Sequence, residues 1–137
     1  MVRYYPRTIR AKIVVPTSAK ENVFISGALV DEVSEGEKTS LTVPVNERWW
    51  IVDIYLDSAV DSEIGDLLVK IIKNDRKPLL EFYANSQVRS LDTRVPPPIL
   101  VFNGGDKLTV KGAPLKVPSS EKTVEIKMDV VIEDFSS

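Results

Sequence analysis

The sequence predicts a single domain folded as an antiparallel two-sheet β-sandwich of about eight to ten strands. Three observations predict this fold class. Hydrophobic and polar residues alternate along several segments, turn-forming residues separate those segments, and helical periodicity is almost absent. The chain has 137 residues, of which 43% are hydrophobic and 28% are charged. A chain of this size and composition can bury a core without disulfides or metals to reinforce it.

The clearest strand lies near the end of the sequence. Its hydrophobic residues occupy every second position, at Val124, Ile126, Met128, Val130 and Ile132. We expect Ile126 and Met128 to face the core, whereas Glu125 and Lys127 face solvent. The same period predicts two further strands, whose inward residues are Ile9, Ala11, Ile13 and Val15 in one and Leu41, Val43 and Val45 in the other. Polar outer faces of this kind favour antiparallel pairing.

Turn-forming residues divide the remaining strands. Residues 67–73 and 79–84 are hydrophobic segments on either side of residues 74–77, a pattern typical of a hairpin. Asn103-Gly104-Gly105-Asp106 predicts a tight turn, and Pro96-Pro97-Pro98 predicts a stiff connection between sheets or edges. Only residues 58–68 could form a helical turn or two. Many short strands with regularly spaced turns favour a jelly roll among the β-sandwiches.

Two residue types are missing from the chain, which contains no cysteine and no histidine. Their absence removes disulfides, thiolate nucleophiles, histidine metal sites and mechanisms of the Ser-His-Asp type. Residues 1–7 have no apolar run after their positive charges, so we expect no cleavable secretory signal. No hydrophobic stretch is long enough for a transmembrane helix. We therefore predict a protein that is not an enzyme and that uses no cofactor.

Residues 57–66 form an acidic segment that contains Asp57, Asp61, Glu63 and Asp66. Calcium binds several hard oxygen ligands that converge from a flexible loop, so this segment is the best candidate for a metal site. Its spacing does not follow the EF-hand pattern, and a solvated acidic loop is the preferred interpretation. We predict no metal site in the protein.

Two adjacent tryptophans, Trp49 and Trp50, lie in a predicted strand and must point to opposite faces. Trp50 shares its phase with residues 52, 54 and 56, which are all hydrophobic, so we expect it in the core. Trp49 is then an exposed platform for a sugar ring or an anchor in a subunit contact. The alternative is a central strand in which both faces are covered.

The N-terminal residues are basic and aromatic. Residues 1–20 carry five basic side chains and no acid, a net charge of +5, whereas residues 21–66 carry two basic and eleven acidic side chains, a net charge of −9. We expect residues 1–7 to form an arm ahead of a sandwich domain at residues 8–137. We also expect the contrast in charge between the two segments to give each copy a patch complementary to one on the next copy. Contacts with a partner or with a particle interior are predicted for Arg3, Tyr4, Tyr5, Arg7, Arg10, Lys12 and Trp49.

Arms of this composition also touch phosphates, so weak contact with nucleic acid or a membrane surface is a further possibility for the N-terminal arm. The alternative is that these charges form the solvated side of a first strand and a frayed terminus.

Four features together resemble the small single jelly-roll structural proteins of virus particles, of the minor capsid or vertex type of icosahedral viruses. They are the basic residues 3–12, the run of short strands, the turn and strand at residues 103–110 and the closing strand at residues 124–132. The resemblance implies a self-assembling building block of a virion, either a pentamer or a trimer, that contacts other virion proteins and no small-molecule substrate. A carbohydrate- or receptor-binding β-sandwich module, cytoplasmic or extracellular, is the alternative.

Overall fold

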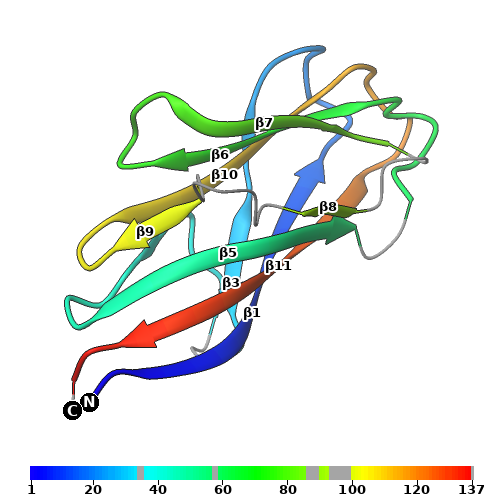
Figure 1. The fold of residues 1–137 in the computed structure, drawn as a ribbon. Coiled ribbons are helices and arrows are strands. Elements are labelled where there is room, and N and C mark those ends of the chain that lie inside the picture. Colours follow the sequence, from blue (N-terminus) through cyan, green and yellow to red (C-terminus); the bar gives the residue numbers. More distant parts are fainter. Residues whose placement is uncertain (34–35, 57–58, 86–89, 93–99, 137) are drawn as a thin grey trace.

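The structure is a computed structural model that describes residues 1–33, 36–56, 59–85, 90–92 and 100–136. These residues form eleven strands and no helix, and so they include no helix that could cross a membrane. The strands pair antiparallel in two sheets that face each other (Figure 1). The predicted antiparallel two-sheet β-sandwich is confirmed.

The two sheets contain six and five strands. Sheet A has the order β3 (Ala28–Asp31), β1 (Arg3–Val15), β11 (Lys122–Asp134), β5 (Glu47–Leu56) and β8 (Ser90–Asp92), with β9 (Val101–Asn103) also paired to β5. Sheet B has the order β2 (Ile25–Ser26), β10 (Lys107–Pro114), β6 (Leu67–Lys73) and β7 (Pro78–Ala84), with β4 (Leu41–Thr42) also paired to β10.

The strands pair in nested order from the chain ends inward. The first strand, β1, pairs with the last, β11, and β4 pairs with β10. Further in, β5 pairs with β8 and β9, and β6 pairs with β7 in the predicted hairpin. A nested set of antiparallel pairs rolled into two sheets is the arrangement of a jelly roll, which was the favoured expectation.

The pairing of β1 with β11 forms the centre of sheet A. Each strand has 13 residues, and the pairing runs from Arg3 opposite Asp134 to Val15 opposite Lys122 with no shift in register. As predicted, Ile126 and Met128 are fully buried, and Glu125 and Lys127 alternate with them on the partly exposed face. The inner residues of both strands belong to one hydrophobic core.

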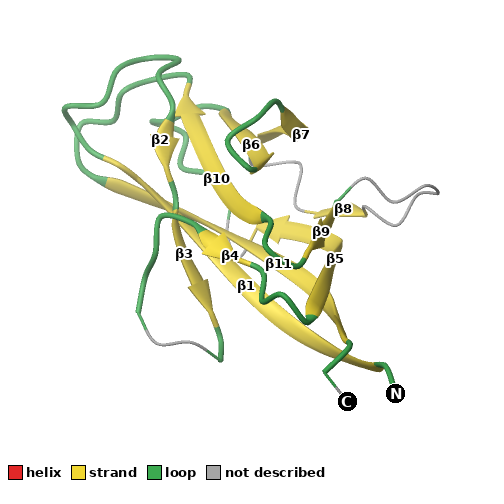
Figure 2. Cartoon of the chain, turned by 90° about the vertical axis from the view of Figure 1, so that its left-hand side faces the viewer, coloured by secondary structure: helices red, strands yellow, loops and turns green. Residues whose placement is uncertain are grey.

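The predicted N-terminal arm is wrong. Residues 3–7 are part of β1 and pair with residues 130–134 of β11, so they belong to the sandwich. Tyr5 and Arg7 continue the same alternation that places Ile9 in the core, and β11 is long enough to pair with them. Figure 2 shows the two chain ends side by side at the end of sheet A.

A bulge changes the phase of β5. In its pairing with β11, Ile51 lies opposite Val130 and Asp53 lies opposite Asp129, so Val52 is an extra residue in β5. If the alternation seen after the bulge is extended back along β5, it therefore assigns each side chain before the bulge to the wrong face of the sheet.

The expected orientation of the two tryptophans is consequently wrong. Trp49 faces the core and is 2% exposed, whereas Trp50 is half-buried on the outer face of sheet A. Ile54 and Leu56, which follow the bulge, are buried as expected. A period-two pattern cannot be extended across a bulge, because the extra residue reverses every side chain before it.

Two other expectations differ from the structure or fall outside it. The strand expected to reach Val45 ends at Thr42, and Val45 is exposed. Pro44 has no N–H for a sheet hydrogen bond, and its carbonyl instead accepts a bond from the Glu47 N–H across a turn. The predicted connection at residues 96–98 lies outside the described residues.

The turns at one end of the sandwich are held together around Asp106. Its carboxylate accepts hydrogen bonds from Asn74 Nδ2 at 2.9 Å and from the Asn103 N–H at 2.8 Å. Gly104 is required in the predicted turn beside it, because a Cβ there would lie 2.5 Å from the Val45 carbonyl oxygen. Residues from the turns β4–β5, β6–β7 and β9–β10 therefore meet at one point.

Deleting residues 1–7 should destabilise the protein, because it removes five residues of β1 together with their pairing. We expect the free energy of unfolding to fall by about 2 kcal/mol or more, measured by urea denaturation. Deleting only residues 1–2, which precede β1, is the control and should leave the unfolding curve unchanged. Equal stability of both truncated proteins would show that residues 3–7 add nothing to the sheet.

Asp106 should make the stability depend on acid pH. Burial would raise the pKa of Asp106, but the hydrogen bonds from Asn74 and Asn103 and the charge of Lys73 outweigh it and hold this pKa below its usual range. Since the folded pKa is lower than the unfolded one, the ionised carboxylate stabilises the fold at neutral pH.

This stabilisation is lost as the pH falls from about 4, the usual pKa of an aspartate, through the folded pKa. Asp106→Asn should lower the unfolding free energy at neutral pH and flatten its decline in this range. Urea denaturation at a series of pH values measures both effects. If the two proteins decline in parallel, the pKa of Asp106 does not contribute.

Candidate functional site

A polar pocket of about 400 Å³ opens at the end of the sandwich where the termini lie, and it is called the Arg7 pocket below. Figure 1 shows β1, β5 and β11 of sheet A running on toward this end beyond the strands of sheet B. At this end the inner face of sheet A lies opposite the short strand β4 and the segment that leads into it. The pocket is lined by Arg7 from β1, Asp31 from β3, Glu47 and Trp49 from β5, and Lys38 and Thr42 from the segment between β3 and β5.

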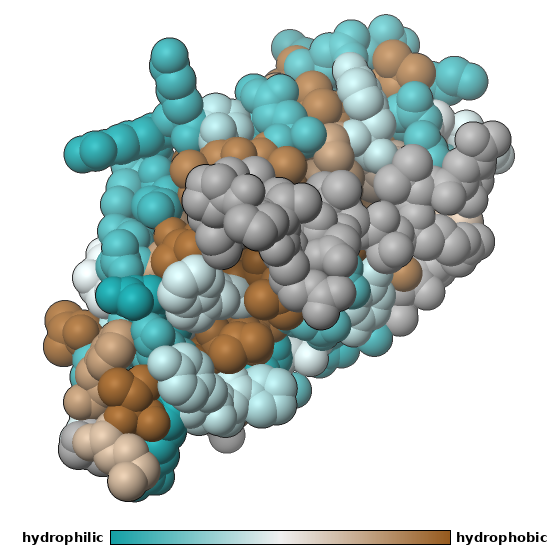
Figure 3. Space-filling view, viewed as in Figure 1, coloured by the Kyte–Doolittle hydropathy of each residue, from teal (hydrophilic) through white to brown (hydrophobic). Residues whose placement is uncertain are grey.

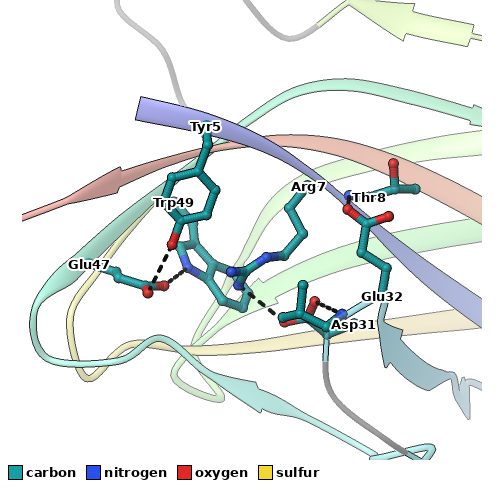
Figure 4. A network of polar contacts seen from close by, with 8 residues as sticks. Tyr5, Arg7, Thr8, Asp31, Glu32, Glu47 and Trp49 are labelled. Carbon is teal, nitrogen blue, oxygen red and sulfur yellow. Dashed lines mark hydrogen bonds and ion pairs between the residues drawn. The ribbon is translucent and has the colours of Figure 1, made fainter. Parts of the chain in front are cut away.

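Arg7 is the central cation of the pocket. Its side chain is only 10% exposed, and Nη1 lies 3.4 Å from Asp31 Oδ2. The guanidinium carbon is 5.5 Å from the centre of the Tyr5 ring and 5.9 Å from the centre of the Trp49 ring, as Figure 4 shows from close by. The aromatic rings stabilise the buried positive charge. Among the described residues, no partner accepts a hydrogen bond from the buried Arg7 Nε.

Two carboxylates lie on either side of Arg7 (Figure 4). Glu47 accepts a hydrogen bond from Trp49 Nε1 at 2.9 Å and one from the Tyr5 hydroxyl at 3.4 Å. Asp31 is 5% exposed and accepts a bond from the Val33 N–H at 3.2 Å besides its contact with Arg7. Burial, together with the charge of Glu47, raises the pKa of Tyr5, so this phenol remains a hydrogen-bond donor at neutral pH. The network joins β1, β3 and β5.

The residues predicted to contact partners do not form one surface. Tyr5, Arg7 and Trp49 come together in or beside the Arg7 pocket on the inner side of sheet A. Tyr4, Arg10 and Lys12 alternate with them and therefore point to the outer side. Arg3 is exposed at the start of β1. Hydrogen bonds from Ser136 and Asn46 lower the pKa of Asp134, and the charge of Arg3 adds to this effect.

The basic residues of β1 are balanced by acids of the same chain. Arg10 lies 3.5 Å from Glu125, and Lys12 lies 3.3 Å from Glu37. With Arg7 beside Asp31, much of the positive charge expected to meet another copy is already neutralised within the chain. The expected charge contrast between the two segments therefore gives little support to contact between copies.

Sequence reasoning missed Asp31, Glu47 and Lys38 as parts of a site. A signal for the pocket was present, because Tyr5 and Arg7 have the same phase as the inward-facing Ile9. Extending that alternation would have predicted a buried arginine, and a buried arginine requires a nearby acid. Which acid supplies the contact depends on long-range pairing between strands and is not visible in a single sequence.

A second feature is an apolar row across the outer face of sheet A. Pro6 lies opposite Val131, Val131 opposite Trp50, and Trp50 opposite Val101, so these residues cross four adjacent strands. None of them is fully buried.

Aromatic side chains extend this row toward the chain ends. Tyr4 is 65% exposed and Phe135 is 43% exposed. The guanidinium of Arg48 lies 5.3 Å from the Phe135 ring centre and 5.9 Å from that of Trp50. We call this surface the terminal patch, and its residues are Tyr4, Pro6, Arg48, Trp50, Val101, Val131 and Phe135. Figure 3 shows hydrophobic side chains gathered at the end of the molecule where the termini lie.

The acidic segment at residues 57–66 is described only from Ala59 onward, so Asp57 lies outside the described residues. Asp61 lies 3.3 Å from Lys122 Nζ, and Glu63 accepts a bond from the Ser119 hydroxyl at 2.7 Å. The described part forms a turn, with no helix. Its acidic side chains bind Ser119 and Lys122, so they hold this loop against the start of β11. Within the described ranges, no three acidic side chains are grouped so that they could hold a metal ion.

No protein-family model matches the chain, and a search of curated proteins also finds no match. The interpretation of both surfaces therefore depends on their geometry.

Replacing Arg7 should be costly because it leaves Asp31 charged and buried. We expect Arg7→Met to lower the unfolding free energy by about 2 kcal/mol or more, and Arg7→Met combined with Asp31→Asn to recover part of that loss. Arg10→Met, at an exposed ion pair on the same strand, is the control and should cost less than about 1 kcal/mol. Equal costs for Arg7→Met and Arg10→Met, measured by denaturation, would contradict the buried network.

Proposed function

We propose that the protein is a non-enzymatic structural subunit that associates with copies of itself through the terminal patch, as a building block of a virus particle. The observation that carries this proposal is the apolar row of Pro6, Val131, Trp50 and Val101, which lies across four strands and is only partly covered by its own chain.

The composition of the terminal patch suits a contact between proteins. Tryptophan, tyrosine, phenylalanine and arginine are the residues enriched at the centres of protein interfaces. Here Arg48 lies beside the rings of Trp50 and Phe135 and also lies 3.0 Å from Glu133, so its position is fixed before any partner binds. Preorganised side chains on a rigid sheet lose little conformational entropy when they are buried.

The jelly roll itself supports two classes of function, because it occurs in viral capsid domains and in lectins. The alternative, a carbohydrate- or receptor-binding module, was expected to use Trp49 as an exposed platform. Trp49 is buried with its Nε1 bonded to Glu47, so it offers no ring face to a sugar. Two exposed aromatic residues, Tyr4 and Phe135, belong instead to the terminal patch, and a third, Tyr83, lies apart from it on β7 of sheet B.

We extend the proposal to the assembly that the resemblance implies. Several copies form a closed ring, of five or three subunits, within a virion and beside other virion proteins. Such a ring requires that the terminal patch of each copy meets a different surface of the next copy, and closure of the ring then buries the patch in every copy.

A lysine placed within the terminal patch should prevent self-association. We expect the intact protein to form oligomers whose mass persists in high salt, because the contact is apolar, and Val131→Lys to be monomeric. Val14→Lys is the matched control, since Val14 points outward from the same sheet but lies far along β1 from the patch. Light scattering coupled to size-exclusion chromatography measures the masses, and circular dichroism checks that both variants fold. An intact protein that stays monomeric, or a Val131→Lys variant of unchanged mass, would refute the proposal.

A further inference from the structure

We infer that the Arg7 pocket binds a carboxylate group, a role independent of the terminal patch. Both carboxylates of the pocket accept hydrogen bonds from the chain, whereas the guanidinium of Arg7 is incompletely bonded. Each of its two carboxylates already accepts bonds from two groups, Glu47 from Trp49 and Tyr5, and Asp31 from Val33 and Arg7. The least satisfied group that lines the pocket is a donor, the guanidinium of Arg7.

Arg7 is the main source of the unused donors. A guanidinium group has five N–H bonds, but the hydrogen bond from Nη1 to Asp31 is 3.4 Å long, beyond the usual range of about 2.7 to 3.2 Å. Its Nε is buried, and no residue of the described chain accepts a bond from it. The Tyr5 and Trp49 rings attract the charge but supply no oxygen acceptor. A side chain that is nine-tenths buried and has so few acceptors is stabilised by a ligand that brings them.

Other donors line the same pocket. Lys38 and the hydroxyl groups of Ser40 and Thr42 come from the segment that leads into and forms β4, across the pocket from β1. A ligand held by Arg7 therefore lies in a pocket whose lining also includes one lysine and two hydroxyl-bearing residues. The volume of about 400 Å³ admits a small acid or an acidic side chain.

The side chains that line the pocket favour a carboxylate over other anions. The two coplanar oxygens of a carboxylate match two parallel N–H bonds of a guanidinium. Phosphate carries more negative charge at neutral pH, and Asp31 and Glu47 repel it more strongly than they repel a single charge. The carboxylate can come from a free small acid or from a glutamate or aspartate side chain of another protein chain.

Nuclear magnetic resonance of the intact protein tests this inference through two reporter groups. The Nε–H of Arg7 and the Nε1–H of Trp49 both lie at the pocket, so their signals should shift when a carboxylate binds. Three probes are titrated at constant ionic strength: sodium acetate, a Gly-Glu-Gly peptide with both ends blocked, and inorganic phosphate. Sodium chloride serves as the blank.

We expect saturable shifts of both signals with acetate or the peptide, with a dissociation constant of about 1 mM, and weaker binding of phosphate. Tighter binding of the peptide than of acetate identifies a protein side chain as the source, and equal binding identifies a small acid. Lys38→Met, which leaves the buried network intact, should weaken binding several-fold, whereas Arg10→Met, outside the pocket, should not change it.

Two results would overturn the inference. One is the absence of any saturable shift at either reporter with acetate and with the peptide. The other is binding of phosphate as tight as that of the carboxylates, which would show that charge alone governs the pocket. Neither result depends on the oligomeric state, so failure here is distinguishable from failure of the proposed assembly.

Discussion

The pairing of β1 with β11 is the constraint on which the rest of the structure depends. Two strands of 13 residues pair without a shift, and their length exceeds that of the strands facing them in sheet B. Sheet A therefore extends beyond sheet B at the end where both termini lie. Here its inner face lies opposite β4, a strand of only two residues, and the segment that leads into it. The nested pairs of the jelly roll follow from this outermost pair inward.

The same extension produces both surfaces described above. Because side chains alternate along β1, Arg7 enters the Arg7 pocket with Tyr5 beside it, while Tyr4 and Pro6 join the terminal patch. The bulge at Val52 is equally necessary, since it turns Trp49 toward Arg7. Trp50 is turned outward by the same shift. The extended end of β1 and the single inserted residue in β5 thus place a polar pocket on the inner face of sheet A and an apolar patch on its outer face.

Sequence patterns predict those parts of the fold in which the period is unbroken. The strand containing Ile126 and Met128, the hairpin of β6 and β7 and the turn at Gly104 all follow from local signals. The basic residues of β1 were misinterpreted because charge suggested solvent, although Arg7 has the phase of a core residue. The orientation of Trp50 depends on a bulge that only the pairing with β11 reveals. The contacts of Arg7 with Asp31 and of Tyr5 with Glu47 join residues far apart in the chain, and no local pattern encodes them.

Both surfaces require residues 3–7 to be an integral part of sheet A. Nuclear Overhauser contacts between β1 and β11 in solution test this requirement most directly. We expect cross-strand contacts between Tyr5 and Ile132 and between Arg7 and Val130, as strong as those between Ile9 and Met128. Random-coil chemical shifts for residues 1–7, with cross-strand contacts that begin only at Ile9, would contradict the account.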